Sequence, residues 1–141
     1  MKFLVTGHDD FSIGLKSALT MIAGTLDDVV IVPFKAEEQL EAYRTKIDSE
    51  LQTNDSVICF TDLLGGTPFK TCVELAISKN QVFVLSGTNL GMLLEASLLR
   101  KLVKEPAELC QLVLQSGKDN ITLFSQNKDT LVEDLVLFMG N

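Results

Sequence analysis

Four short runs of apolar, β-branched and aromatic residues recur at intervals along the first two thirds of the chain. They lie at Lys2–Thr6, Val29–Pro33, Ser56–Thr61 and Gln81–Ser86. The runs are continuous rather than alternating, which is typical of strands that are covered on both faces. Helices supply such cover on the two faces of a parallel sheet. The pattern therefore predicts an α/β fold.

Apolar residues at helical spacing separate these runs, so predicted helices alternate with predicted strands. This alternation favours a parallel sheet with right-handed crossovers. We expect a three-layer, flavodoxin-like open sheet, mostly parallel, with the strand order 2-1-3-4. Gly24 is expected to end the first helix, and Thr67 and Pro68 to cap and begin the third. The apolar stripes are Phe11, Leu15, Leu19 and Ile22; Leu40, Tyr43, Ile47 and Leu51; Phe69, Cys72, Val73, Ala76 and Ile77; and Met92, Ala96, Leu99 and Val103.

The last third of the chain is less regular. Pro106 to Ser116 predicts a helix that ends at Gly117, and Asn120 to Phe124 predicts a short strand. Asp129 to Met139 predicts a final amphipathic helix. We expect one domain over residues 1–125 and a C-terminal helical extension over residues 126–141.

Composition excludes several classes of protein. The net charge of -7 provides no basic field for a nucleic acid. No apolar run approaches the roughly 18 residues that a membrane-spanning helix needs, and the start of the chain does not resemble a signal peptide. A zinc site would need more soft ligands than the chain offers with one histidine and three scattered cysteines, Cys59, Cys72 and Cys110. Buried, reduced thiols and a cytoplasmic location are the expectation.

The chemistry is expected where two strands end. In open α/β sheets, ligands bind beyond the carboxyl ends of the strands, where the strand order reverses. For the order 2-1-3-4 that place lies between the first and third strands. The first strand ends in Thr6-Gly7-His8-Asp9 and the third in Thr61-Asp62-Leu63-Leu64-Gly65-Gly66-Thr67-Pro68-Phe69. His8 and Asp62 should therefore face each other across a crevice.

Each of these residues has a chemical use there. A neutral imidazole is a nucleophile near neutral pH, and a carboxylate such as Asp62 would hold His8 in one tautomer. Gly65 and Gly66 allow close approach of the backbone, and Thr67 adds a hydroxyl at the start of a helix whose positive end favours an anion. The set suits a transferable phosphoryl group, without a metal or a nucleotide.

Simpler interpretations fit the same residues. His8 could be an ordinary polar loop residue, and Asp62 could only cap a turn. The segment Gly65-Gly66-Thr67-Pro68 could be a tight connection between strand and helix. Asp9 and Asp10 could cap the first helix, and we expect that at least one of them does.

The segments VTGH, GLKSALTMIAG, FTDLLGGTPF and GTNLGMLLE together resemble the mannose-family IIA domain of the bacterial sugar phosphotransferase system (PTS). The resemblance extends from about Met1 to Phe124. It implies a phosphoryl carrier that takes phosphate from the phosphohistidine of HPr and passes it to an EIIB partner. The EIIB partner then phosphorylates sugar at the membrane IIC/IID carrier.

The resemblance also implies roles for single residues. His8 occupies the position of the phosphorylated histidine, modified on the ring nitrogen distal to the backbone, and Asp62 that of the aspartate bonded to the other nitrogen. Gly66 and Thr67 match phosphate-contacting positions, with Gly65 beside them. Asn89 to Glu95 would border the site.

Partner contacts follow from the same resemblance. Met92 and Phe69 would offer apolar contacts to partner proteins. The family is dimeric, and its late strand, here Asn120 to Phe124, crosses to the sheet of the other subunit. Because the chain ends at Asn141, EIIB is expected to be a separate polypeptide.

Two positions depart from the family pattern. Asp9 stands where many relatives have glycine, and we expect its side chain to point outward and cap the first helix. Gly91 stands where many have proline, which would leave that loop more mobile.

Two alternative functions remain open from the sequence. The phosphocarrier subunit of a dihydroxyacetone kinase has the same family pattern, and a non-catalytic, flavodoxin-like anion-binding regulator could use the same helix end. A flavin enzyme is less favoured, because the first loop lacks a Ser/Thr-rich phosphate site and the chain has no tryptophan. Mannose, fructose, sorbose, amino sugars and gluconate are all possible sugars.

Overall fold

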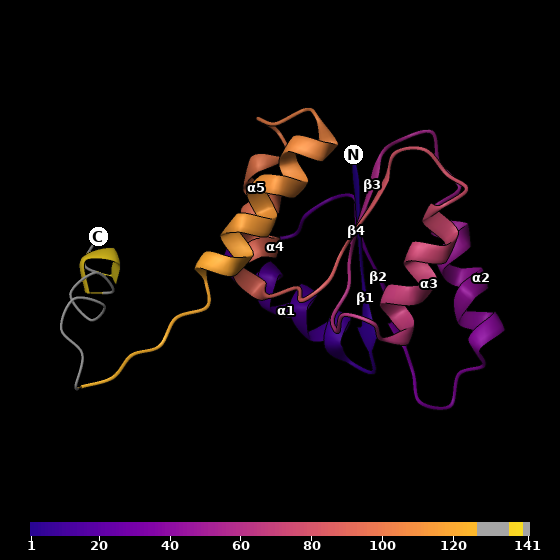
Figure 1. The fold of residues 1–141 in the computed structure, drawn as a ribbon, viewed down its shortest axis with the longest axis horizontal. Coiled ribbons are helices and arrows are strands. Elements are labelled where there is room, and N and C mark those ends of the chain that lie inside the picture. Colours follow the sequence, from indigo (N-terminus) through magenta and orange to yellow (C-terminus); the bar gives the residue numbers. More distant parts are fainter. Residues whose placement is uncertain (127–135, 140–141) are drawn as a thin grey trace.

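A four-stranded parallel sheet with helices on both faces forms the body of the molecule (Figure 1). The computed structural model describes residues 1–126 and 136–139. The strand order is β2-β1-β3-β4, so the predicted order 2-1-3-4 is confirmed. The strands are β1 (Lys2–His8), β2 (Val29–Phe34), β3 (Val57–Phe60) and β4 (Val82–Leu85). The helices are α1 (Phe11–Ala23), α2 (Leu40–Glu50), α3 (Thr67–Ala76), α4 (Leu90–Leu99) and α5 (Pro106–Asp119).

The two faces of the sheet bury separate apolar cores. Phe3 and Val5 of β1 point into the core shared with α1, α4 and α5. Leu4, between them, points into the other core, which includes Tyr43 of α2 and Cys72 of α3. Figure 1 shows α1, α4 and α5 on one side of the strands and α2 and α3 on the other. Burial on both faces explains why the strands read as continuous apolar runs.

Not every residue of the predicted helical stripes is buried. Ile22, Leu40 and Ile77, each a member of a predicted stripe, are exposed. Ile22 lies in the last turn of α1, Leu40 is the first residue of α2, and Ile77 follows the last residue of α3. A periodic stripe covers the sheet only over the middle of each helix, so the end positions reach solvent. The three cysteines are free and buried, as expected.

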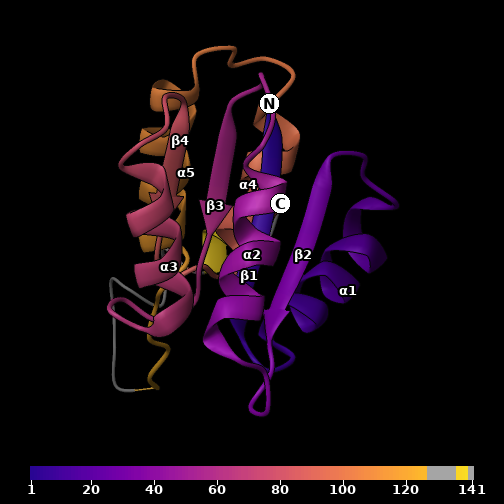
Figure 2. The same ribbon diagram turned by 90° about the vertical axis from the view of Figure 1, so that its right-hand side faces the viewer.

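The register of β1 decides where the functional groups meet. β1 pairs with β2 as far as His8 opposite Phe34, and with β3 as far as Val5 opposite Phe60. β1 therefore extends beyond the last paired residue of β3, and the segment that follows β3 can turn toward its end. Figure 2 shows β2 and β4 at opposite edges of the sheet, with β1 and β3 between them.

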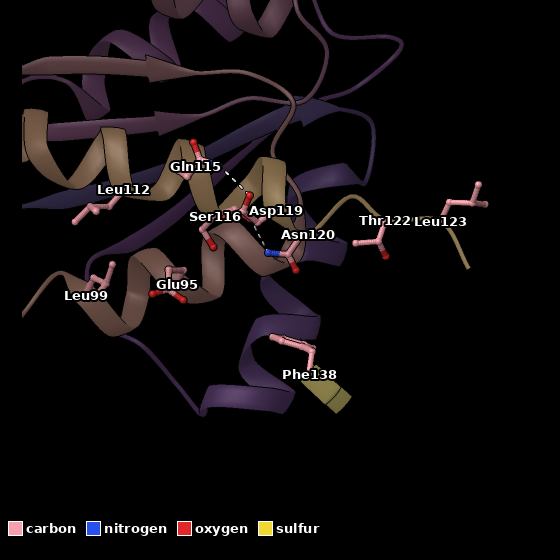
Figure 3. A pocket seen from close by; sticks show the side chains of 10 residues that line it. All are labelled: Glu95, Leu99, Leu112, Gln115, Ser116, Asp119, Asn120, Thr122, Leu123 and Phe138. Carbon is pink, nitrogen blue, oxygen red and sulfur yellow. Dashed lines mark hydrogen bonds between the residues drawn. The ribbon is translucent and has the colours of Figure 1, made fainter. Parts of the chain in front are cut away.

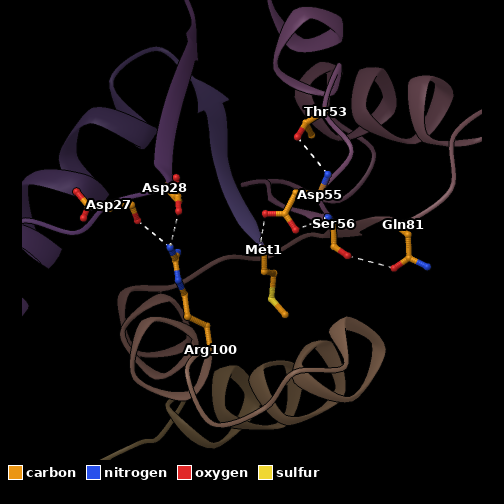
Figure 4. Close-up of polar contacts among 8 residues, drawn as sticks. All are labelled: Met1, Asp27, Asp28, Thr53, Asp55, Ser56, Gln81 and Arg100. Atoms are coloured by element: carbon orange, nitrogen blue, oxygen red, sulfur yellow. Dashed lines mark hydrogen bonds and ion pairs between the residues drawn. The ribbon is translucent and has the colours of Figure 1, made fainter.

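Polar contacts tie the loops together at the amino ends of the strands (Figure 4). Arg100, just after α4, donates from Nη2 to the backbone oxygen of Asp27 at 2.8 Å and lies 4.6 Å from the centre of the Phe3 ring. The terminal amine of Met1 donates a hydrogen bond to Asp55, and this bond lowers the pKa of Asp55. These contacts stabilise the end of the sheet opposite to His8.

The helix α5 is longer than predicted. We expected it to end at Gly117, but it continues to Asp119. Gly117 is buried against Met92, and a Cβ atom there would lie 2.9 Å from the sulfur of Met92. The side-chain amide of Asn89 also donates to the backbone oxygen of Gly117 at 2.9 Å. This glycine therefore serves close packing of α5 on α4 and does not end the helix.

Replacing Gly117 by alanine tests this interpretation. The added Cβ would press on Met92, so we expect the free energy of unfolding to fall by about 1 kcal/mol, despite the better helix propensity of alanine. Gly14, inside α1, is the matched control, because a Cβ there meets nothing within 4 Å. Gly14→Ala should raise the free energy of unfolding by roughly 0.5–1 kcal/mol. Urea unfolding of both variants measures the difference, and an unchanged or more stable Gly117→Ala would contradict the packing role.

The strand predicted over Asn120–Phe124 is not formed in this single chain. Residues 121–125 are irregular, and Ile121, Leu123 and Phe124 are exposed. A strand needs a neighbour that pairs with its backbone groups, and here the segment leads away from α5 and from the sheet (Figure 1). Of the helix predicted over Asp129–Met139, residues 136–139 are helical and residues 129–135 lie outside the described part.

Candidate functional site

His8 is the last residue of β1 and lies at the carboxyl edge of the sheet. Its register partner on β2 is Phe34, whose ring meets the imidazole edge to face at a centroid distance of 6.2 Å. The side chain of His8 is 48% exposed. The backbone of His8 is therefore fixed by a buried strand, while about half of its side chain remains accessible to a partner.

Asp62 holds both the backbone and the ring of His8. Its Oδ2 atom accepts a hydrogen bond from the backbone N–H of His8 at 2.8 Å and lies 2.8 Å from Nδ1 of the imidazole. Its Oδ1 atom accepts from the backbone N–H of Leu63 at 2.7 Å. The structure thus brings His8 and Asp62 together, as the order of the strands predicts.

The ionised carboxylate of Asp62 selects the tautomer of the neutral His8 ring. Burial alone would raise the pKa of Asp62, but hydrogen bonds from the backbone and ring of His8 and from the Leu63 N–H outweigh it, so the pKa is lowered. An ionised carboxylate only accepts hydrogen bonds, so Nδ1 of the neutral ring must carry the hydrogen. This leaves Nε2 with a free lone pair, and the exposed edge of His8 can act as a nucleophile.

Two glycines allow these close contacts. A Cβ at Gly7 would lie 3.0 Å from the carboxyl carbon of Asp62. A Cβ at Gly66 would lie 2.9 Å from Cε1 of His8 and 3.2 Å from the backbone oxygen of Leu63. Gly65 is different: its φ of +83° lies in the left-handed region, and a Cβ there would meet nothing within 4 Å. Gly7 and Gly66 provide space beside His8 and Asp62, and Gly65 provides the turn.

The amino end of α3 borders the imidazole. We expected Thr67 to cap this helix, but Gly66 is the N-cap and Thr67 is the first helical residue. No side chain caps the helix, and Pro68 in the first turn has no N–H to satisfy. Uncapped amides at a helix start, together with the helix dipole, favour an anion. The arrangement can therefore place a phosphate between His8 and α3.

The two glycines of this turn give a matched pair of variants. Gly66→Ala should push the His8 ring away from Asp62. Loss of a contact that orients a reacting side chain typically lowers activity by about tenfold or more, so reaction at Nε2 should slow by about that factor. Its backbone φ of −73° suits alanine, so the fold should be preserved. Gly65→Ala should instead lower the free energy of unfolding by about 1–2 kcal/mol through backbone strain and leave His8 in contact with Asp62. Reaction rates and urea unfolding of both variants would separate the roles, and equal effects on the rate would contradict this assignment.

Asp9 and Asp10 do not cap α1. Asp10 occupies the N-cap position without a side-chain cap bond, so the expected capping is wrong. Both carboxylates instead face Lys35, which follows β2: Lys35 hydrogen-bonds Asp10, and its Nζ lies 3.6 Å from Oδ1 of Asp9. Asp9 does point outward, with 72% of its side chain exposed. Its φ of +50° is left-handed, which explains why glycine suits this position.

The expected partner contacts are corrected in part. Met92 is 2% exposed and packs under Gly117, so it offers no surface to a partner. Phe69 is half-buried. The exposed apolar side chains beside the site are Leu63 and Leu64, which the sequence analysis did not single out. The sequence does carry a signal for this surface: two leucines lie between the end of a buried strand and a Gly-Gly turn, where side chains reach solvent.

Gly91 lies inside α4 rather than in a loop. A Cβ there would come within 2.2–2.5 Å of the side chain of Asn120, whose Nδ2 donates to the backbone oxygen of Ser116. The expectation of a mobile loop at this position is therefore wrong. Asn89, before it, caps α4 by accepting from the Met92 N–H at 3.0 Å.

A cavity of about 620 Å³ opens elsewhere, between α4, α5 and the segment that follows (Figure 3). It is lined in part by Leu99, Leu112 and Phe138. None of His8, Asp62 or Gly65–Thr67 lines it.

In the part of the chain that the structure describes, no three His, Cys, Asp or Glu side chains gather as a metal site would require. The described helices include none that is both long and apolar enough to cross a bilayer.

The fold and the site together define an open parallel α/β domain that presents a carboxylate-bonded histidine beside a helix N-terminus. Residues 2–113 match the family model described as the PTS system fructose IIA component, of the mannose type. The chain belongs to this family of PTS EIIA components, which are phosphotransferases of bacterial sugar uptake.

Curated relatives carry the names of several sugars. The chain is 30% identical over 101 residues to the fructose-specific EIIA component of Bacillus subtilis, covering 70% of this chain and 69% of that one. It is 31% identical over 99 residues to the sorbose-specific EIIA component of Lacticaseibacillus casei, covering 69% and 72%. The mannose-specific EIIAB component of Escherichia coli K12 is 28% identical over 111 residues, which is 76% of this chain but only 34% of that longer protein.

Solved structures agree with the fold. The PTS component EIIA from Streptococcus agalactiae superposes with a TM-score of 0.84 and 34% identity, covering 87% of this chain and 96% of that one. The mannose/sorbose-specific IIA subunit from Enterococcus faecalis superposes with a TM-score of 0.82 and 27% identity, covering 92% and 98%.

Proposed function

We propose that this chain is a phosphoryl carrier in which Nε2 of His8 accepts the phosphoryl group of phospho-HPr and passes it to a separate EIIB subunit. The observation that carries the proposal is the contact of Asp62 with Nδ1 and with the backbone of His8. In the neutral ring this contact leaves Nε2 as the nitrogen with the free lone pair.

The proposed reaction is an in-line transfer between histidines. The lone pair of Nε2 forms the new N–P bond while the bond from phosphorus to the donor histidine breaks, and that histidine keeps the electron pair. The ionised Asp62 stabilises the positive charge that develops on the His8 ring. The amino end of α3, with Thr67, offers N–H groups and a hydroxyl to the phosphoryl oxygens, and Gly66, whose own N–H donates to the backbone oxygen of Leu63 at 2.9 Å, leaves room for them. Positioning and charge stabilisation are sufficient for such a transfer.

The surface beside His8 suits protein partners. Leu63 and Leu64 expose apolar side chains in the loop that also carries Asp62, with Phe69 nearby in α3. We propose that HPr and EIIB dock on this loop, which would exclude water from the transferring group.

We also propose that the family's dimer applies to this chain. Ile121, Leu123 and Phe124 are exposed in the single chain, and a second subunit would bury them by pairing the segment as an exchanged strand. The relatives' names include fructose and sorbose for EIIA components and mannose for an EIIAB component. Sugar selection is therefore assigned to the membrane carrier, which this subunit reaches only through EIIB.

Phosphorylation of the purified chain by phospho-HPr tests the proposal. We expect the intact mass to increase by one phosphoryl group, the modification to be labile in acid and stable in base, and fragmentation to map it to the peptide that contains His8. Addition of the EIIB subunit of the same system should remove it. An unchanged mass would exclude this function and favour an anion-binding protein, and an acid-stable phosphate on a hydroxyl would exclude His8 as the acceptor.

A further inference from the structure

Three aspartates contact or directly follow the one histidine of this chain. Asp62 contacts His8 directly, and Asp9 and Asp10 follow it in the loop to α1. The backbone N–H of Asp9 donates to the backbone oxygen of Phe34 at 2.8 Å, which fixes this loop against the end of β2. A phosphoryl group on His8 would add roughly two further negative charges to this region.

Lys35 is the cation that meets this acidic loop. It follows Phe34, whose ring contacts the His8 imidazole, and it hydrogen-bonds Asp10 while lying 3.6 Å from Asp9. Among the described residues, the ion pairs bring no other lysine or arginine to Asp9, Asp10 or Asp62. The hydrogen bond to Asp10 raises the pKa of Lys35, so the amine stays charged.

These ion pairs do little for the fold. The Lys35 side chain is 45% exposed and the two aspartates are 72% and 66% exposed. Exposed pairs of this kind contribute little to stability, because water and salt screen them. Lys35 directly follows Phe34, whose ring contacts the His8 imidazole, and this position at the end of β2 points instead to an effect on charge at the site.

We propose that Lys35 is a positioning residue for the phosphorylated state: it holds the Asp9 and Asp10 carboxylates and offsets their charge, so that His8 can accept and keep a dianionic phosphoryl group. This inference rests on the proposed function, and it adds a residue to which no role in the transfer has been assigned so far. Lys35 forms and breaks no covalent bond; it changes the electrostatic potential in which His8 reacts.

A small phosphoryl donor separates this effect from docking of HPr. Potassium phosphoramidate transfers its phosphoryl group directly to imidazoles, and intact mass measures the rate of His8 phosphorylation. We expect Lys35→Gln to lower this rate by about three- to tenfold at low ionic strength, and the difference to shrink as salt is added. Lys35→Arg should restore the rate of the unmodified sequence.

Two further variants make the test specific. Arg44 of α2 also pairs with an exposed carboxylate, that of Glu74, so Arg44→Gln is the matched control and should react at the normal rate. In an Asp9→Asn/Asp10→Asn background, Lys35→Gln should change the rate by less than about twofold, because the carboxylates that it offsets are gone. Urea unfolding should show all variants to be folded.

The outcomes distinguish the two proposals. If the unmodified chain is phosphorylated on His8 and Lys35→Gln reacts equally fast at low salt, the role of Lys35 is refuted while the carrier function stands. The same holds if the Lys35→Gln effect persists undiminished in the Asp9→Asn/Asp10→Asn background. If the unmodified chain takes no phosphoryl group from either phosphoramidate or phospho-HPr, both proposals are wrong.

Discussion

Replacing His8 by alanine is expected to abolish labelling of the chain by phospho-HPr. His8 is the only histidine in the sequence, so no second imidazole can take its place. The three cysteine thiols are buried. A hydrogen bond with Cys72, together with burial, raises the pKa of Cys59, and burial raises the pKa of Cys110, which makes these sulfurs poor substitutes. Intact mass after incubation with phospho-HPr measures the loss directly.

A second variant separates loss of the nucleophile from loss of structure. His8→Gln keeps an N–H donor that can reach Asp62 but has no ring nitrogen to attack phosphorus. Because nearly half of the His8 side chain is exposed, both variants should remain folded, with a change of about 1 kcal/mol or less in the free energy of unfolding. Labelling that survives in either variant would place the reactive group elsewhere and refute the proposed role of His8.

Asp62→Asn is expected to slow phosphoryl transfer by about 100-fold while the chain stays folded. Asp62 accepts three hydrogen bonds, two from His8 through Oδ2 and one from Leu63 through Oδ1. An asparagine has one oxygen, so either His8 or Leu63 would face an N–H₂ group instead of an acceptor. The amide also lacks the negative charge that stabilises the charged ring formed during transfer.

The same variant should alter the dependence of stability on pH. The pKa of Asp62 is lowered in the folded chain, so its ionised form stabilises the fold above the ordinary aspartate pKa of about 3.9. This contribution is lost as the pH falls through the lower, folded-state pKa. Asp62→Asn has no such group, so its deficit in free energy of unfolding should be largest above about pH 4 and should narrow in more acidic solution.

Stopped-flow or quenched-flow transfer from phospho-HPr, with urea unfolding at several pH values, measures both effects. Asp48 provides a control, because it is partly exposed on α2 and pairs with Lys79. Asp48→Asn should leave the transfer rate unchanged. A normal transfer rate in Asp62→Asn would remove this carboxylate from the mechanism, whatever its effect on stability.

The sequence was sufficient to predict the sheet and the centre of the site. The continuous apolar pattern of the four strands predicts a parallel sheet with helices on both faces, and the order 2-1-3-4 is that of the flavodoxin-like sheet expected for such a chain. Once the order is known, the ends of β1 and β3 must be neighbours, and His8 meets Asp62 for that reason. Neither step requires knowledge of how single side chains pack.

The details that sequence reasoning missed depend on such packing. Gly117 has the form of a helix stop, but it lies under Met92, and a local pattern does not reveal the neighbouring helix. Met92 was assigned to the surface for the same reason. Asp9 and Asp10 stand where residues that cap a helix usually stand. Their carboxylates pair instead with Lys35, which is distant in sequence.

The geometry at His8 has a kinetic consequence. Asp62 occupies one ring nitrogen, so only Nε2 is left both to receive the phosphoryl group and to give it away. Donor and acceptor proteins would then need the same face of the domain, and a ternary complex of the three could not react. Under the proposed function, steady-state rates measured against one partner at several fixed levels of the other should give parallel double-reciprocal plots, the signature of a double-displacement (ping-pong) mechanism.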